Sequence, residues 1–307
     1  MIDSMLRPLL ICLIAVVSLT SCQREAIREQ RTSPPTIHPV SVHVGLRAVD
    51  SRRYFGWNGL CLPCATNATR YAQFAKDLGF SGNVLLSPTV EQFYAAIRTA
   101  ATATPAAGTF LLTYNGHGSE VPDVRYTTAP LAYGYTATDQ TFTLVDREVL
   151  DKELLNLWTT FQPNVTIIFI ADSCHSGGIA KLSPDTRGGQ LKFLDTPVQD
   201  QIINAYGRDY AKIQQALPLI NPHTIKQNVI LLAACEVSEL AIYEPARMSF
   251  TDHFFTVWNS DRHAPTLQAL LHNVRTDLLK VNTKQHAFYD DFGSNIAVVR
   301  QRPPFQH

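Results

Sequence analysis

Apolar and polar positions divide the chain into segments with two different periodicities. Apolar runs begin at Thr109 and Thr166, and each leads into a glycine-containing segment with reactive side chains. A short apolar run that ends at a glycine turn is typical of a strand buried on both faces. Similar patterns predict further strands over 40–46, 83–86, 228–233 and 296–299.

Helical spacing separates these strands. From Tyr71 to Leu78, apolar residues recur at i, i+3, i+4 and i+7. We expect another helix after Ser87 and Pro88, with Ser87 as its N-cap. Further helices are predicted over 150–161, within 195–217 and from Thr266 onwards. Strands that alternate with helices predict an α/β fold, with a mostly parallel central sheet flanked by helices on both faces.

Composition agrees with a globular domain and narrows the classes of partner. The chain has 307 residues, of which 45% are hydrophobic and 17% charged, and its formal net charge is zero. Without a basic surplus or a run of lysine and arginine, we expect no nucleic-acid partner.

The N-terminus has a separate character. An apolar run over 9–19 follows Arg7, and it is shorter than the ~20 residues of a spanning helix but suits a secretory signal. It ends at Ser21 and Cys22, which resemble the lipobox of bacterial lipoproteins, where the cysteine is lipidated and becomes the first mature residue. An ordinary signal peptide and an uncleaved anchor are the alternatives. Gln23, rather than Asp, follows the cysteine; by resemblance to Gram-negative lipoproteins, this places the protein in the outer membrane of the cell envelope.

Three segments follow from these patterns. We predict a lipoprotein signal peptide over 1–21, a flexible tether over 22–39 and one folded domain over 40–307. In an exported chain a disulfide between Cys61 and Cys64 is permitted. The pair is interpreted as structural, with or without a bridge; a redox-active pair is the alternative, and zinc is disfavoured because no second pair exists.

Two strands end in residues suited to nucleophilic catalysis. His117 lies between Gly116 and Gly118, and Cys174 follows the strand that begins at Thr166. A histidine beside a cysteine raises the thiolate fraction and later protonates the leaving group. The amides of Gly118 and Cys174 are candidate oxyanion donors. His175 is less suited as the base, because neighbouring side chains on a strand point to opposite faces.

Asp172 lies two residues before Cys174, so both side chains face the same side if the strand continues. A buried carboxylate beside a substrate pocket would select a basic side chain. The alternative is a structural role, in which Asp172 accepts hydrogen bonds from loop amides.

The segments Asn115-Gly-His-Gly118 and Asp172-Ser-Cys-His-Ser-Gly177 resemble the two catalytic signatures of the metacaspases, a family of caspase-like cysteine peptidases. The histidine precedes the cysteine by 57 residues, in agreement with the caspase spacing. The resemblance implies a caspase-like fold, with a large-subunit-like part over about 40–192 and a small-subunit-like part over about 225–300. It also implies a Cys174–His117 dyad, cleavage of protein or peptide substrates after Arg or Lys, and a monomer.

Departures from the family pattern affect the substrate pocket and the metal. Asn67 stands where the family has a second pocket aspartate, so it would bind substrate with an amide. Asp139 and Asp151 match acidic positions that the family links to calcium, but Lys152 and Lys181 replace further carboxylates. Calcium favours several anionic oxygens, so we expect no metal site and at most a weak response to calcium.

The leading hypothesis is therefore a lipid-anchored cysteine endopeptidase. The alternative is a catalytically silent caspase-fold lipoprotein that binds peptides or acts as an envelope scaffold. A thiol-dependent transferase or redox protein ranks last, because only the Cys61–Cys64 spacing and an oxidising compartment support it.

Overall fold

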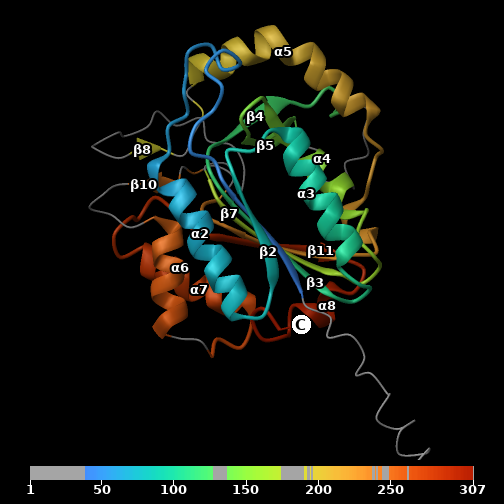
Figure 1. Ribbon diagram of the computed structural model, residues 1–307, viewed down its shortest axis with the longest axis vertical. Coiled ribbons are helices and arrows are strands. Elements are labelled where there is room, and N and C mark those ends of the chain that lie inside the picture. Colours follow the sequence, from blue (N-terminus) through green and yellow to red (C-terminus); the bar gives the residue numbers. More distant parts are fainter. Residues whose placement is uncertain are drawn as a thin grey trace, which may run out of the picture. The chain divides into compact units, whose positions relative to one another are not determined.

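A six-stranded sheet forms the centre of the part of the chain that the structure describes (Figure 1). The structure is a computed structural model, and it describes residues 39–126, 137–173, 190–191, 194, 196–236, 239, 241–243, 249–260 and 263–306. The strand order is β11 (Phe288–Gly293), β9 (Asn228–Ala233), β7 (Thr166–Asp172), β3 (Thr109–Asn115), β1 (Val40–Gly45) and β2 (Ser81–Leu86). All neighbours pair in parallel except β11, which is antiparallel to β9. The predicted α/β class with a mostly parallel sheet is confirmed.

Helices cover both faces of this sheet, as Figure 1 shows. On one face lie α2 (Leu62–Asp77), α6 (Phe250–Ser260) and α7 (Leu267–Leu278); on the other lie α3 (Val90–Ala103) and α4 (Asp151–Trp158). Strand side chains alternate between the two layers, so Ile168 and Ile170 pack towards α6 while Ile167 and Phe169 pack towards α4. Each fully buried side chain of this kind stabilises the fold by about 1.5–3 kcal/mol.

A second, antiparallel sheet adjoins the carboxyl end of β3. It consists of β4 (Gly118–Pro122), β5 (Thr138–Thr143) and β6 (Glu148–Leu150), and α5 (Thr196–Ala216) extends across it (Figure 1). Polar side chains hold α5 in place: Gln199 donates to Glu120 O at 2.6 Å, and Gln214 donates to Pro122 O at 2.9 Å. The described part also contains a short pair of β8 (Gln190–Leu191) with β10 (Ile242–Tyr243), a 3-10 turn at Pro222–Thr224 and α8 (Ile296–Val299).

The predicted start of the helix after Ser87 is wrong by two residues. Thr89, not Ser87, is the N-cap of α3. Thr89 N donates to Gln92 Oε1 at 2.9 Å, and Gln92 N donates to Thr89 Oγ1 at 3.3 Å, which forms a capping box. Ser87 instead adopts a positive φ of 47° and accepts a hydrogen bond from Arg47 N at 3.0 Å. The two hydrogen bonds of the Thr89–Gln92 capping box therefore decide where the helix begins, rather than the Ser87-Pro88 pair on which the prediction was based.

The last predicted strand, over 296–299, is also wrong, because those residues form α8. The strand lies earlier, at β11, whose centre carries Asp290 and Asp291. A four-residue apolar run does not distinguish strand from helix by periodicity. Only Val299 of α8 is buried, whereas the aromatic residues of β11 pack on β9 at the edge of the sheet.

No helix in the described ranges is both long and apolar enough to cross a membrane.

A buried histidine on β1, the strand next to the edge strand β2, makes the fold sensitive to acid. His43 of β1 has no exposed surface, and its ring nitrogens lie 3.0 Å from Thr113 Oγ1 and 2.9 Å from Ser41 Oγ. Burial lowers the pKa of His43 from 6.5 to about 4. The folded state therefore holds this imidazole neutral at a pH where the unfolded chain binds a proton.

We predict that acidification from pH 6.5 to 4 lowers the free energy of unfolding through His43. The unfolded state binds the extra proton across this window, so stability falls as the pH falls, by up to about 3 kcal/mol. Denaturant unfolding from pH 4 to 8 measures the effect, with His43→Gln as the comparison. An identical pH dependence in both proteins would contradict the assignment.

Candidate functional site

The two strands that carry the predicted catalytic residues are neighbours. β3 and β7 pair in parallel, with Asn115 opposite Asp172, so both end at the same edge of the sheet. His117 follows β3 by two residues, and Asp172 is the last residue of β7. Cys174, the predicted nucleophile and second oxyanion donor, lies outside the described residues, as does His175. The sheet therefore brings His117 and Asp172 to one edge, where the chain continues to Cys174.

His117 is held by a backbone carbonyl that the sequence interpretation did not identify. Its ring is 4% exposed, and Nε2 lies 3.0 Å from Gly59 O. A carbonyl only accepts, so Nε2 carries the proton and the neutral ring has its lone pair on Nδ1. The Trp57 ring packs against the His117 ring in a T-shaped arrangement, with centroids 4.9 Å apart and an interplanar angle of 69°. This arrangement suits Nδ1 to act as a base.

The backbone around His117 is also fixed. His117 O accepts a hydrogen bond from Thr143 N at 2.9 Å, and the Tyr114 hydroxyl lies 2.8 Å from the same oxygen. Burial raises the pKa of Tyr114 well above its ordinary value, so the phenol remains a donor. A Cβ at Gly116 would overlap this hydroxyl, which explains the glycine at that position.

Gly118 begins β4 and pairs with Phe142 of β5. It is buried, and its carbonyl accepts a hydrogen bond from Leu194 N at 3.2 Å, just ahead of α5. Its backbone is therefore fixed directly after His117. The role of its amide in binding an oxyanion stays a prediction.

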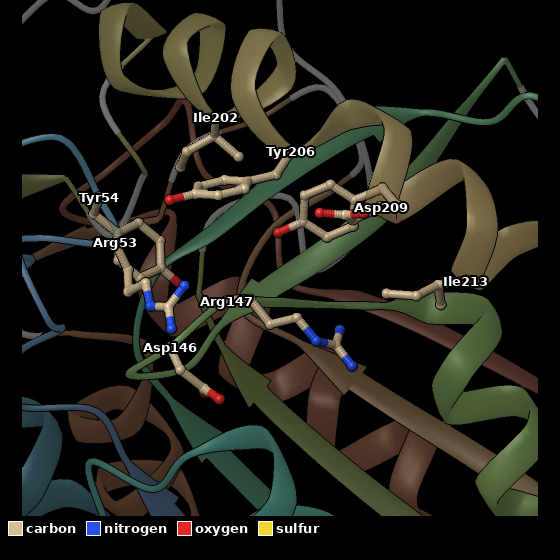
Figure 2. A pocket seen from close by; sticks show the side chains of 9 residues that line it. Arg53, Tyr54, Asp146, Arg147, Ile202, Tyr206, Asp209 and Ile213 are labelled. Carbon is tan, nitrogen blue, oxygen red and sulfur yellow. The ribbon is translucent and has the colours of Figure 1, made fainter.

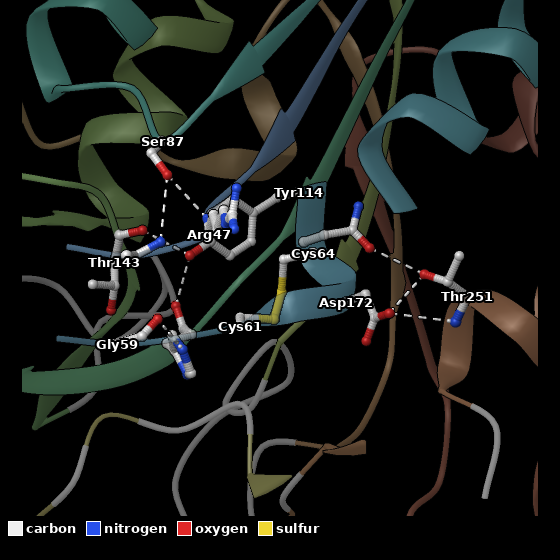
Figure 3. The surroundings of a disulfide bond; sticks show 12 residues. Arg47, Gly59, Cys61, Cys64, Ser87, Tyr114, Thr143, Asp172 and Thr251 are labelled. Atoms are coloured by element: carbon white, nitrogen blue, oxygen red, sulfur yellow. Dashed lines mark hydrogen bonds between the residues drawn. A yellow bond between two sulfur atoms is a disulfide. The ribbon is translucent and has the colours of Figure 1, made fainter. Parts of the chain in front are cut away.

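Asp172 binds the first turn of α6. Its side chain is 1% exposed, and Oδ2 accepts from Thr251 Oγ1 at 2.6 Å and from Thr251 N at 3.3 Å (Figure 3). A helix N-terminus stabilises a carboxylate. Thr251 Oγ1 also lies 3.1 Å from the side-chain amide of Asn115. The atom of Asn115 at this distance is Oδ1, so the single hydroxyl proton has two acceptors to choose from, and it goes to the nearer one, Asp172 Oδ2.

Asn67 of α2 lies next to an ion pair. It is 3% exposed, and its Oδ1 accepts from Arg70 Nη1 at 3.3 Å. The same Nη1 donates to Asp252 Oδ1 at 2.6 Å. Burial alone would raise the pKa of Asp252, but hydrogen bonds from Arg70 and Ser249 outweigh it and hold the pKa below its ordinary value.

Consecutive residues of α6 therefore link the two predicted substrate-binding residues. Thr251 binds Asp172, and Asp252 reaches Asn67 through Arg70. This chain has an amide, Asn67, where the family has a second aspartate, but the carboxylate of Asp252 lies nearby. Neither Thr251 nor Asp252 stands in a motif that would have identified it.

The acidic positions that the family resemblance links to calcium do not fit a calcium ion. Lys152 Nζ lies 2.9 Å from Asp151 Oδ2 and 3.6 Å from Asp139 Oδ1, so an ammonium already faces both carboxylates. Burial and the charge of Asp151 raise the pKa of Asp139, and Gln214 donates to its Oδ2 at 3.0 Å. Across the described ranges, no group of three or more His, Cys, Asp or Glu side chains could hold a metal ion. Lys181 lies outside the described residues.

The Cys61–Cys64 pair is a disulfide. Cys61 is the N-cap of α2, and Cys64 lies in its first turn. Both residues are buried, at 4% and 0% exposure. The sequence left open whether this structural pair is bridged, and the structure shows the bridge.

A cavity of about 260 Å³ lies between α5 and the segments at 53–54 and 146–147 (Figure 2). Its lining combines aromatic, aliphatic and charged side chains, namely Arg53, Tyr54, Asp146, Arg147, Ile202, Tyr206, Asp209, Tyr210 and Ile213. Neither His117 nor Asp172 contributes to it. The described lining of the cavity therefore comes from other residues than these two.

Comparisons with known proteins agree on the fold. A family model described as the caspase domain matches residues 49–305. Among solved structures, the protein GSU0716 from Geobacter sulfurreducens has a TM-score of 0.73 at 25% identity, with 87% of this chain and 98% of that chain covered. Caspase-1 from Spodoptera frugiperda has a TM-score of 0.50 at 12% identity, with 84% and 90% covered. The search of curated proteins finds no match. These matches confirm the predicted caspase-like fold.

We predict that calcium leaves the melting temperature of the wild-type protein unchanged, because Lys152 occupies the space between Asp139 and Asp151. If calcium did bind, a free calcium concentration of 100 times its Kd would raise the free energy of unfolding by about 2.7 kcal/mol. Thermal scans in calcium and in chelator would detect such a change. Lys152→Gln should lower the melting temperature more than Lys212→Gln, whose ammonium forms an exposed pair with Asp209. A clear calcium-dependent rise in the wild-type protein would overturn this assignment.

Proposed function

Because this chain belongs to the caspase domain family, we propose that it is a cysteine endopeptidase that cleaves after arginine or lysine. The observation that carries the proposal is the hydrogen bond from His117 Nε2 to Gly59 O at the edge where β3 and β7 end. It gives His117 the tautomer of a base, and the chain reaches the Cys174 thiol two residues after Asp172.

The proposed reaction begins with proton transfer from the Cys174 thiol to His117 Nδ1. The thiolate attacks the scissile carbonyl carbon, and the amides of Gly118 and Cys174 donate to the oxyanion that forms. The imidazolium then protonates the leaving amine as the C–N bond breaks, which leaves a thioester on Cys174. Water, deprotonated by His117, hydrolyses the thioester and restores the thiol.

Charge near Asp172 supports the proposed preference for basic side chains. Asp172 and Asp252 carry two negative charges on or beside the first turn of α6, and Arg70 offsets one of them. A net negative charge remains for a substrate guanidinium or ammonium. Asn67 would contribute hydrogen bonding without charge.

We predict that the wild-type protein hydrolyses fluorogenic peptides with Arg or Lys before the scissile bond, but not peptides with Asp there. Cys174→Ala should abolish turnover, because the thiolate is the nucleophile. Asp172→Asn should lower kcat/KM for Arg peptides by about 10- to 100-fold, the effect of losing a hydrogen bond to a charged group.

Asp77→Asn is the matched control, since Asp77 is an exposed carboxylate at the end of α2. Turnover that survives Cys174→Ala would remove the proposed mechanism. If the wild-type protein cleaves none of the peptides, a silent peptide-binding scaffold becomes the better description.

We also propose that the protein is exported and anchored in the bacterial outer membrane through a lipid on Cys22. The lipobox-like sequence carries this proposal, and the Cys61–Cys64 disulfide supports it, because disulfides persist in oxidising compartments. Residues 22–39 would then tether a monomeric peptidase domain, over 40–307, to the membrane surface.

Mass spectrometry of the protein from a Gram-negative host tests the anchor. The mature chain should begin at Cys22 and carry a thioether-linked diacylglycerol, and Cys22→Ala should prevent both lipidation and membrane attachment. A mature chain with an unmodified Cys22 would refute the anchor without bearing on the peptidase proposal.

A further inference from the structure

The loop that presents Gly59 to His117 ends in a disulfide, and we infer that the Cys61–Cys64 bond positions the Gly59 carbonyl for catalysis. The inference rests on the proposed function, since it takes His117 as the base. It assigns a positioning role to two cysteines that the reaction itself does not use.

The Gly59 carbonyl decides which nitrogen of His117 carries the proton. Nε2 lies 3.0 Å from Gly59 O in a buried environment. Without this acceptor, the neutral ring would exchange between two tautomers, and only the one protonated on Nε2 leaves a lone pair on Nδ1 for a thiol. The position of one carbonyl oxygen therefore controls the fraction of molecules that are ready to react.

Gly59 cannot hold its position through its own side chain. Its φ is +56°, and a Cβ there would meet the Trp57 ring at 3.0 Å, so the position requires glycine. The residues on either side supply the restraint. Asn58 O accepts from Val49 N at 2.9 Å, and Cys61 N donates to Arg47 O at 2.8 Å (Figure 3).

Cys61 is also the point where the loop becomes helix α2. Cys61 is its N-cap but makes no side-chain capping hydrogen bond. An N-cap without a side-chain acceptor leaves the first amides of a helix less well satisfied. The disulfide replaces the missing cap with a covalent link from Cys61 to the first turn.

The other end of the disulfide is firmly anchored. Cys64 has no exposed surface, and its carbonyl packs so closely against β1 that a Cβ at Gly45 would lie 2.6 Å from it. Cys64 therefore provides a fixed point on the sheet. The disulfide carries this restraint to Cys61, two residues from the carbonyl that orients His117.

Loss of the disulfide should therefore weaken catalysis more than substrate binding. The Cys61→Ser, Cys64→Ser double variant should lower kcat by about 10- to 100-fold, the range that small misplacements of catalytic groups produce. KM should change less than threefold, about 0.7 kcal/mol, because Asp172 is held by Thr251 on α6 rather than by this loop. Leu62→Ala, an exposed change between the two cysteines, should leave both constants unchanged.

A direct measurement separates positioning from general destabilisation. Long-range proton–nitrogen NMR of histidine-labelled protein reports the tautomer of each ring, and His117→Asn assigns the signals. In a Cys174→Ala background, the disulfide-bonded protein should show His117 protonated on Nε2 alone. The double serine variant should show a mixture of tautomers.

Reduction of the folded protein provides a test that does not require the variant to fold. A phosphine breaks the S–S bond to give two thiols and is itself oxidised to the phosphine oxide, with oxygen from water. Alkylation of both thiols confirms the reduction. A shift of His117 to mixed tautomers supports the inference; retention of the Nε2–H tautomer, or a kcat within twofold in the double variant, overturns it. If the protein cleaves no peptide, the proposed function fails while the tautomer result still decides whether the disulfide positions Gly59.

Discussion

The parallel pairing of β3 with β7 is the constraint on which the rest of the structure depends. Every residue of both strands is buried, and the register sets Asn115 opposite Asp172. A shift of one residue would turn each strand's side chains to the opposite layer. Because Ile168 and Ile170 fill the layer beneath α6, while Ile167 and Phe169 fill the layer beneath α4, this register is strongly specified. The hydrophobic core thereby determines where His117 and Asp172 lie.

Polar residues at the end of the sheet follow from the same burial. A buried carboxylate, imidazole or phenol is costly unless it is hydrogen-bonded. Thr251 donates to Asp172 Oδ2, Gly59 O accepts from His117 Nε2, and the Tyr114 hydroxyl contacts the carbonyl of His117. Two of these partners come from distant parts of the chain, Thr251 on α6 and Gly59 on the loop after β1, whereas Tyr114 lies on β3 itself. The candidate site therefore depends on several segments packing together, so a displacement of one segment alters the position of the side chains that it holds.

The sequence predicted the parts of the fold that depend on local pattern. Strands β3, β7 and β9 are continuous apolar runs, and His117 and Asp172 stand directly after or at the end of two of them. Partners that act through tertiary contact carry no such signal. Gly59 contributes only a carbonyl, and Thr251 lies 79 residues from Asp172. The edge strand β11 escaped prediction because its aspartates interrupt the apolar pattern, whereas the apolar run at 296–299 formed a helix.

Because the Gly59 carbonyl orients the His117 ring, the position of the ring depends on the position of the loop that carries Gly59. The segment from Leu46 to Cys61 contains turns but no helix or strand, so its hydrogen bonds lack the cooperative support of regular structure. The disulfide restrains it where the helix cap is absent. A reducing cytosol would remove that restraint, whereas an oxidising envelope would preserve it. The proposed export signal and the buried disulfide thus support each other: the compartment maintains the bond, and the bond maintains the orientation of His117.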